Sequence, residues 1–271
     1  MAPIPASRRI WYIQKGKAEY RPRTATARIL SPQDGNPPFL VLPWDPHIAK
    51  TRPMNQPRPS PRPRWIERQL IRRGISDRRV LDAFAAVPRS EFVDPRFRSR
   101  SHVDAPIPIG CRQTVSQPYV IALSLQALAL TGRETVLDIG TGSGYQTVLL
   151  SHLAAQVYTI EIHQRLYTNA RLAIQAHARS PVHTRSGDGS MGWPEEAPFD
   201  AIVAGACAPR VPESLPEQLA TGGRLVLPVG NDTSQALMRY VKQEDGSLKK
   251  NRLEWVLFVP LVGREGTGHM P

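Results

Sequence analysis

Cysteine is scarce in this sequence, and long apolar runs are absent. Only Cys111 and Cys207 occur among 271 residues, far apart and without the spacing of metal ligands or of a disulfide framework. No stretch of 18 apolar residues is present, and the charged N-terminus lacks the apolar core of a secretory signal. We therefore expect reduced thiols, no metal, no membrane contact and a cytoplasmic location.

Acidic residues are also scarce, but only near the N-terminus. Residues 1–75 hold 15 Lys and Arg against 4 Asp and Glu, which leaves 20 against 19 for residues 76–271. The formal net charge of +12 therefore belongs mainly to the first part of the chain. Such a segment would suit a nucleic-acid or membrane-surface partner, yet it is more often a solvated tail. We expect no specific nucleic-acid partner and a nearly neutral folded body.

Proline is abundant in the same N-terminal part. Thirteen of the 27 prolines lie between Pro3 and Pro63, where their missing N–H donors oppose regular helix. We expect residues 1–60 to form a basic, Pro-rich and largely disordered arm, with Met54 as an alternative start of translation. The folded domain is expected over residues 61–271, with a helical part over 61–131 and an α/β core over 132–271.

The start of this domain has the apolar spacing of helices. Residues 64–87 predict two amphipathic helices broken at Gly74, with Ser76 and Asp77 supplying a cap for the second. Residues 116–130 predict a third, mostly buried helix.

After Gly132, short apolar runs alternate with helical patterns. The predicted strands cover residues 134–140, 156–162, 182–189, 199–207 and 223–230, and the predicted helices cover 145–155, 164–178 and 212–220. Strands interleaved with helices favour an α/β fold with a mostly parallel, doubly wound sheet covered on both faces. Two further runs, residues 235–243 and 255–263, flank an Asp-Gly turn and predict an antiparallel C-terminal pair.

A glycine-rich loop, DIGTGSG from Asp138 to Gly144, follows the first predicted strand. Glycines allow sharp turns and close approach of the backbone to a ligand, and the next helix offers free N–H donors at its N-terminus. The loop therefore indicates a nucleotide-like ligand. It is only moderately specific, because dinucleotide sites use a similar loop and a glycine turn can be purely structural.

Two acidic residues follow the next strands. Glu161 ends the second strand, where a carboxylate can accept hydrogen bonds from both ribose hydroxyls, although a solvated surface Glu is the alternative. Asp188 follows the third strand and could meet an adenine amino group, although Asp-Gly is also a common turn. Because the carboxyl ends of parallel strands share one edge, we expect both acids and the loop to line one crevice that suits an adenosyl ligand.

Several segments between residues 64 and 263 resemble the protein-L-isoaspartate O-methyltransferases. The most diagnostic is QTVSQP, from Gln113 to Pro118, and VLDIGTGSG and GDGSMGWPEEAPFDAIVAGA are similar as well. The resemblance implies a Rossmann-like class I methyltransferase domain. It also implies S-adenosyl-L-methionine as cofactor, S-adenosyl-L-homocysteine as product, and damaged proteins with L-isoaspartyl or D-aspartyl residues as substrates.

The resemblance also assigns roles to single residues. Ser116 takes the position of the family's active-site serine, whereas without the resemblance it would be interpreted as a helix cap. The expected cofactor contacts are Gln113, Thr114, Val115, Asp138, Gly140, Thr141, Gly142, Ser143, Gly144, Glu161, Asp188, Gly189 and Gln235. Cys111 and Arg112 depart from the family, which often has small residues there, and are expected to alter the substrate loop. His163 is expected at a helix end or on the surface.

The implied reaction needs no strong general base, because an ionised carboxylate already carries the charge for attack. Positioning and desolvation should supply most of the acceleration, and we expect Ser116 to hold the carboxylate in a monomeric enzyme. Two alternatives stay open. One is a methyltransferase of the same fold that acts on RNA or a biosynthetic peptide, and the other is a non-catalytic binding scaffold.

Overall fold

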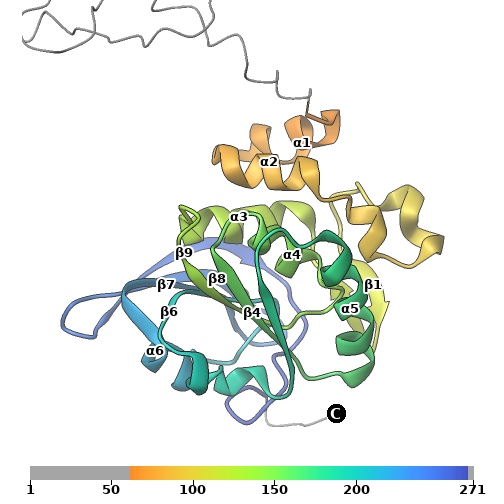
Figure 1. Cartoon of the computed structure of the whole chain (residues 1–271). Coiled ribbons are helices and arrows are strands. Elements are labelled where there is room, and N and C mark those ends of the chain that lie inside the picture. Colours follow the sequence, from red (N-terminus) through yellow and green to blue (C-terminus); the bar gives the residue numbers. More distant parts are fainter. Residues whose placement is uncertain (1–61, 268–271) are drawn as a thin grey trace, which may run out of the picture. The chain divides into compact units, whose positions relative to one another are not determined.

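A seven-stranded sheet runs through the centre of the computed structural model, which describes residues 62–267 (Figure 1). Its strands are β3 (Thr135–Ile139), β4 (Gln156–Glu161), β5 (Val182–Ser186), β6 (Phe199–Ala204), β7 (Leu219–Gly230), β8 (Gln235–Lys242) and β9 (Leu248–Val256). Their order is β5-β4-β3-β6-β7-β8-β9; β3 to β7 are parallel, and β8 and β9 are antiparallel additions. The predicted doubly wound sheet with an antiparallel C-terminal pair is confirmed. The proposed arm over residues 1–60 and Met54 lie outside the described residues.

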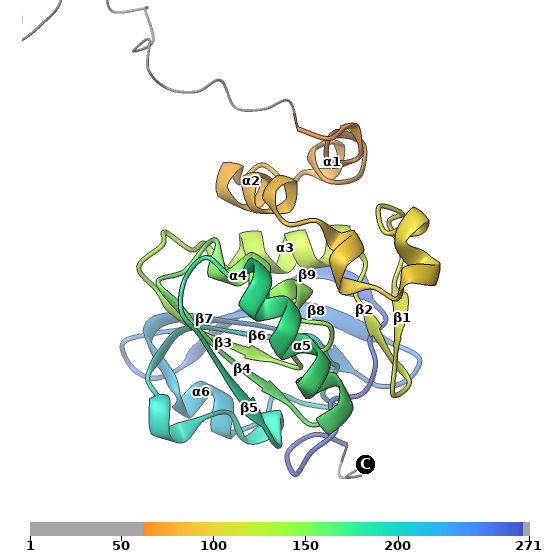
Figure 2. The same ribbon diagram turned by 45° about the vertical axis from the view of Figure 1, so that its right-hand side comes forward.

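Helices cover both faces of this sheet. The helices are α1 (Arg64–Gln69), α2 (Arg78–Ala86), α3 (Pro118–Leu128), α4 (Tyr145–Ser151), α5 (Gln164–His177) and α6 (Ser214–Glu217). Short 3-10 helices are η2 (Ile71–Arg73), η3 (Arg89–Phe92), η4 (Pro95–Arg100), η5 (Gly189–Met191) and η6 (Pro194–Glu196). Figures 1 and 2 place α3, α4 and α5 on one face and α6 on the other.

The central strands are buried on both faces. On β3, Val136 packs into a cluster with α1 to α5, whereas its neighbour Leu137 packs into a second cluster with α6. Both side chains are fully buried. This burial explains why the strand is a continuous apolar run rather than an alternating one.

The break between the N-terminal helices lies at Gly74, as the sequence predicts, although the first helix ends at Gln69 and is followed by the 3-10 turn η2. Gly74 has a left-handed φ of 94° and ends η2, as glycine without a Cβ readily does. Asp77 caps α2, since its carboxylate accepts hydrogen bonds from the N–H groups of Arg79 (2.8 Å) and Val80 (3.4 Å). Ser76 does not share this role, because its N–H donates to Gln126 Oε1 (2.7 Å) and its side chain makes no cap bond.

Two predictions near the C-terminus are wrong. The helix predicted over residues 212–220 shrinks to the four residues of α6, because Pro216 has no N–H donor and Leu219 already begins β7. The strand predicted over residues 255–263 is placed too late, because β9 begins at Leu248.

A separate hairpin lies between the N-terminal helices and α3. It consists of β1 (Ile107–Gly110) and β2 (Gln113–Val115), which pair antiparallel. The turn residues Cys111 and Arg112 have φ values of 48° and 56°. Left-handed φ at both central positions is typical of the tight hairpin turn that favours Asn-Gly, so this chain places two unfavourable residue types there.

We predict that Arg112→Gly stabilises the protein by up to about 1 kcal/mol, because glycine adopts a left-handed φ without a Cβ clash. Urea unfolding followed by circular dichroism measures the change. The matched control is Arg100→Gly on the exposed η4, whose φ is not left-handed; there the same substitution should destabilise. Equal destabilisation by both substitutions would contradict this interpretation of the turn.

Candidate active site

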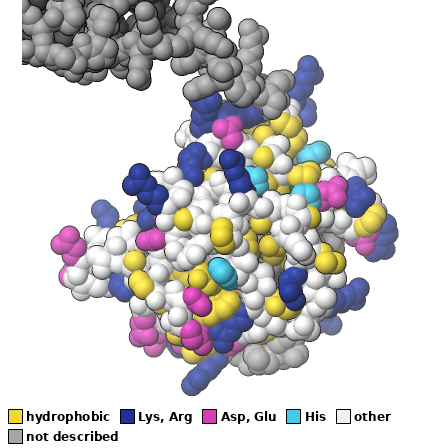
Figure 3. All heavy atoms as spheres, viewed as in Figure 1, with side chains coloured by type: hydrophobic (Ala, Val, Ile, Leu, Met, Phe, Trp, Pro, Cys, Tyr) yellow, Lys and Arg dark blue, Asp and Glu magenta, His cyan; other side chains and the backbone are white. Residues whose placement is uncertain are grey.

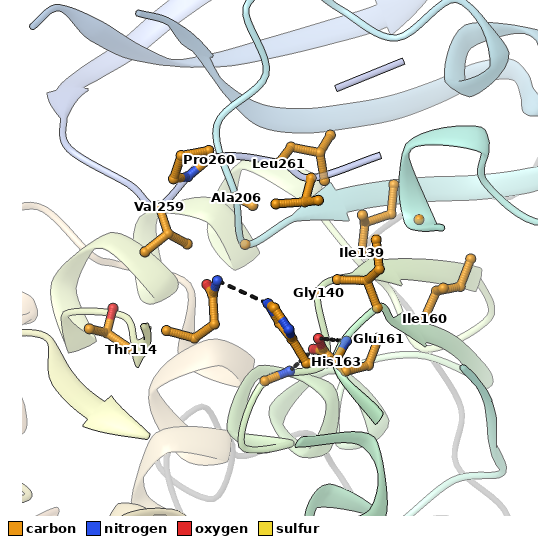
Figure 4. Close-up of a pocket in the computed structure, with 16 residues that line it drawn as sticks. Thr114, Ile139, Gly140, Ile160, Glu161, His163, Ala206, Val259, Pro260 and Leu261 are labelled. Atoms are coloured by element: carbon orange, nitrogen blue, oxygen red, sulfur yellow. Dashed lines mark hydrogen bonds between the residues drawn. The ribbon is translucent and has the colours of Figure 1, made fainter. Parts of the chain in front are cut away.

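The sheet reverses its direction of winding at β3, and a crevice opens there. The chain leaves β3 for β4 on one side, and β6 later occupies the other side. Loops that diverge from neighbouring strands leave a ligand site at their carboxyl ends. The crevice is lined by Gln113, Thr114, Ile139, Gly140, Gly142, Ile160, Glu161, Ile162, His163, Gly189, Gly205, Ala206, Val259, Pro260, Leu261 and Val262 (Figure 4).

Two residues of the glycine loop, Gly140 and Gly142, line this crevice. Gly140, Gly142 and Gly144 all have left-handed φ, at 87°, 58° and 86°. A Cβ on Gly140 would meet no atom within 4 Å, so the glycine keeps backbone next to the crevice uncovered. A Cβ on Gly144 would instead approach Ile174 of α5 to 3.2 Å. The loop therefore offers the close backbone approach that an adenosyl group requires.

Glu161 forms one wall and is almost fully buried. Its Oε2 accepts a hydrogen bond from Gly142 N–H (2.7 Å), and its Oε1 accepts one from His163 N–H (2.9 Å). A carboxylate has about four lone-pair sites, so two such bonds leave acceptor capacity on the side of the crevice. Glu161 thus ties the glycine loop to the turn after β4.

Asp138 lies beneath the glycine loop rather than in the crevice. It is fully buried and accepts hydrogen bonds from Thr147 Oγ1 (2.6 Å), Gln146 Nε2 (2.9 Å) and Thr159 Oγ1 (3.3 Å). Burial raises the pKa of Asp138 to about 6, against the opposing effect of these hydrogen bonds. Thr141 of the loop joins the same network, with its Oγ1 at 2.7 Å from Thr159 Oγ1.

The hairpin supplies the opposite wall through Gln113 and Thr114. Ser116 follows β2, is half-buried, and its hydroxyl makes no hydrogen bond within the part of the chain that the structure describes. It does not cap α3, which begins at Pro118; Tyr119 N–H donates instead to Asp104 Oδ1 (3.0 Å). The interpretation of Ser116 as a helix cap is therefore wrong.

A buried arginine fixes the backbone around Ser116. Arg89 is 1% exposed, and its guanidinium donates to the carbonyl oxygens of Ser101 (2.7 Å), Ala105 (3.2 Å) and Ser116 (2.9 Å). Burial lowers the pKa of this guanidinium. The planar fork of an arginine can reach several carbonyls at once, so one side chain holds both ends of the segment that carries the hairpin.

Two predicted contact residues hold the C-terminal segment instead of lining the crevice. Gln235 donates to Phe258 O (3.2 Å) and accepts from Phe258 N–H (2.6 Å). Asp188 accepts from the N–H groups of Ser190 (2.9 Å) and Arg264 (2.7 Å). These bonds position residues 259–262, which do line the crevice.

The structure thus divides the predicted residues into two groups. Those that line the crevice are Gln113, Thr114, Gly140, Gly142, Glu161 and Gly189. Those that do not are Val115, Ser116, Asp138, Thr141, Ser143, Gly144, Asp188 and Gln235. Gly189 is needed for packing as well, since a Cβ there would lie 2.7 Å from Ile139 Cγ2.

Sequence reasoning missed several lining residues. His163 does stand at a helix end, in the N-cap position of α5, but its ring also faces the crevice. Its place two residues after Glu161 was the available signal. Residues 259–262 gave no local signal, because long-range bonds hold them: Cys207 N–H donates to Val259 O (2.8 Å), and Leu261 N–H donates to Cys207 O (2.7 Å).

The doubly wound sheet with its antiparallel C-terminal strands, the glycine loop after its first strand and the acid after its second are together typical of a Rossmann-like class I methyltransferase. Within residues 62–267 no group of three or more His, Cys, Asp or Glu could hold a metal ion, and none of the helices there is long and apolar enough to cross a membrane. Residues 64–266 match the family described as protein-L-isoaspartate(D-aspartate) O-methyltransferase, and the chain belongs to this family.

Individual relatives agree with this assignment. A protein-L-isoaspartate O-methyltransferase of Geobacter metallireducens is 50% identical over 76% of this chain and 96% of its own length. That of Trichlorobacter lovleyi is 47% identical over 76% and 94%. A Plasmodium falciparum structure described as this type of enzyme, in complex with S-adenosyl-L-homocysteine, has a TM-score of 0.63 and 28% identity over 73% of this chain and 97% of its own.

The raised pKa of Asp138 predicts a pH dependence of stability. The pKa of Asp138 is about 6 in the folded protein and about 3.9 in the unfolded chain, so its protonated form is favoured by folding. This contribution to stability is complete below about pH 3.9 and is lost as the pH rises through about 6. The free energy of unfolding of the wild type, relative to Asp138→Asn, should fall by roughly 2 kcal/mol between pH 4 and pH 7. Urea titrations at several pH values measure this difference.

Asp94 provides a control of opposite sign. Hydrogen bonds from Arg96 lower the pKa of the partly exposed Asp94 to about 2, so its contribution is present above pH 4 and is lost as pH falls. The wild type should therefore lose stability relative to Asp94→Asn on acidification. A flat or rising difference for Asp138→Asn between pH 4 and pH 7 would contradict the interpretation of the buried carboxyl.

Proposed function

We propose that this chain transfers a methyl group from S-adenosyl-L-methionine to the free carboxylate of L-isoaspartyl residues in damaged proteins, the first step of their repair. One observation supports this proposal most strongly. The segment most diagnostic of the family, Gln113 to Pro118, starts with residues that line the same crevice as the glycine loop and Glu161. The proposed cofactor site and the start of this segment, Gln113 and Thr114, therefore line the same opening (Figure 4).

The residues of the crevice suit the cofactor. The uncovered backbone of Gly140, with Gly142 beside it, would take the adenosyl group, and Glu161 would accept hydrogen bonds from its ribose hydroxyls. The apolar side chains of Ile139, Ile160 and the C-terminal segment would contact its uncharged parts. When bound, the cofactor supplies an electrophilic methyl group on a sulfonium.

The protein's own residues have to hold and aim the carboxylate. An ionised carboxylate is already a nucleophile, so the site has no need to remove a proton from it. Ser116 lies two residues after the lining residue Thr114, and Arg89 donates to its backbone carbonyl (2.9 Å). Its half-buried hydroxyl makes no hydrogen bond within the described residues and would be free to donate to a substrate oxygen. We assign it to orienting the carboxylate. Such positioning can account for a large part of the rate enhancement.

The identity of the methyl acceptor is inferred mainly from the family, and less from the surface charge. On the face shown in Figure 3, basic side chains are scattered, with acidic and apolar side chains among them. We favour a peptide acceptor over RNA because the chain belongs to the protein-L-isoaspartate(D-aspartate) O-methyltransferase family. Family membership likewise favours an enzyme over a non-catalytic scaffold. We further propose that the enzyme acts as a cytoplasmic monomer.

We predict that Ser116→Ala lowers kcat/KM for an isoaspartyl peptide by roughly 10- to 100-fold. A hydrogen bond to a charged group contributes about 1.5–3 kcal/mol, which corresponds to a factor of this size. Transfer of labelled methyl to an isoaspartyl peptide, its aspartyl twin and total RNA measures both rate and acceptor. Ser99→Ala, on the exposed part of η4, is the matched control and should leave the rate unchanged.

Binding of S-adenosyl-L-homocysteine to the same variants, measured by calorimetry, separates a lost contact from a lost fold. Ser116→Ala should still bind it. Labelling of RNA but of neither peptide would reject the proposed acceptor, and absence of cofactor binding by the wild type would reject the enzyme itself.

A further inference from the structure

One hydrogen bond joins the two walls of the crevice. Gln113 Nε2 lies 3.2 Å from His163 Nε2, and both side chains line the opening. Gln113 begins β2 of the hairpin, whereas His163 belongs to the turn between β4 and α5. Figure 4 draws this contact as a dashed line that reaches the ring of His163. The contact therefore connects the hairpin with the central sheet.

The main chain of His163 is held by Glu161, which forms one wall of the crevice. Its N–H donates to Glu161 Oε1 (2.9 Å), and the other oxygen of Glu161 accepts from Gly142 N–H (2.7 Å). A continuous series of hydrogen bonds thus runs from the glycine loop through Glu161 and His163 to Gln113. Whatever binds at Gly142 and Glu161 is connected to the hairpin by this series.

The hairpin needs such support at its tip. It is a two-stranded sheet separate from the central one, and isolated two-stranded hairpins are marginally stable. Ile107 and Val115, at its base, are buried in the core. The tip carries the left-handed residues Cys111 and Arg112. Gln113, next to this turn, is where the hairpin meets His163.

The His163 side chain does not cap α5. The residue occupies the N-cap position of α5, but its side chain makes no capping hydrogen bond. Within the described residues, the ring makes its hydrogen bond with Gln113. Replacing the ring should therefore change the hairpin more than the helix.

We propose that His163 is a positioning residue that couples cofactor binding to the placement of the substrate hairpin. This inference rests on the proposed function. A cofactor bound against Glu161 and Gly142 holds the turn that carries His163, and His163 then holds Gln113 and the segment that leads to Ser116. Such coupling is reciprocal, so the cofactor product and the peptide should each raise the affinity for the other by the same factor.

Calorimetry on the full chain tests this coupling without turnover. We expect saturating S-adenosyl-L-homocysteine to strengthen the binding of an isoaspartyl peptide to the wild type by at least about 5-fold, the lower end of typical coupling. The gain should fall below about 2-fold in His163→Ala and in Gln113→Ala. It should be largely restored in His163→Gln, whose amide can still bond Gln113. The exposed His183 on β5, away from the crevice, gives the control His183→Ala with unchanged coupling.

Two further measurements distinguish a lost link from a damaged fold. Amide exchange over residues 107–115 without any ligand should be several-fold faster in His163→Ala than in the wild type, with α5 unchanged. In addition, the loss of coupling in the double variant of Gln113 and His163 should equal the loss in either single variant, since both remove one interaction.

The outcomes separate the two proposals. If the wild type binds neither ligand, the proposed function fails. If it binds both and transfers methyl, but shows no coupling, or His163→Ala keeps the coupling and the slow exchange of the hairpin, only the role of His163 is overturned.

Discussion

The reversal of winding at β3 is the constraint on which the rest of the structure depends. Because β4 and β6 lie on opposite sides of β3, the loops that follow the strands run in opposite directions and leave the carboxyl end of β3 uncovered. The glycine loop, Glu161 and Ala206 therefore meet at one edge of the sheet and leave a crevice between them. The hairpin and residues 259–262, which are far apart in sequence, form further walls of that crevice.

Buried polar groups hold these parts in place. Asp138 joins Thr147 and Thr159 beneath the glycine loop, and Arg89 gathers backbone carbonyls behind Ser116. Each group is buried, and its desolvation disfavours the charged form. Neither group is therefore expected to add much to the stability of the core. Their common effect is to fix backbone on either side of the crevice. A site built for positioning requires this kind of rigid support.

Local patterns were sufficient to predict the strand and helix alternation, the cap at Asp77 and the glycine loop, because each depends on neighbours in sequence. The role of Gln235 and the path after β9 could not be predicted this way. Residues 257–263 have the apolar composition of a strand. Hydrogen bonds to Cys207 and Gln235 hold this segment beside the crevice instead. His163 was missed for a related reason, since its partner Gln113 lies 50 residues earlier in the chain.

A crystal structure of the full chain with S-adenosyl-L-homocysteine would show whether the crevice at β3 holds the cofactor beside the hairpin. We expect the ligand between the glycine loop and the hairpin, with its ribose at Glu161 and its sulfur toward the segment from Gln113 to Ser116. A ligand bound elsewhere, or one whose sulfur lies far from this segment, would contradict this expectation.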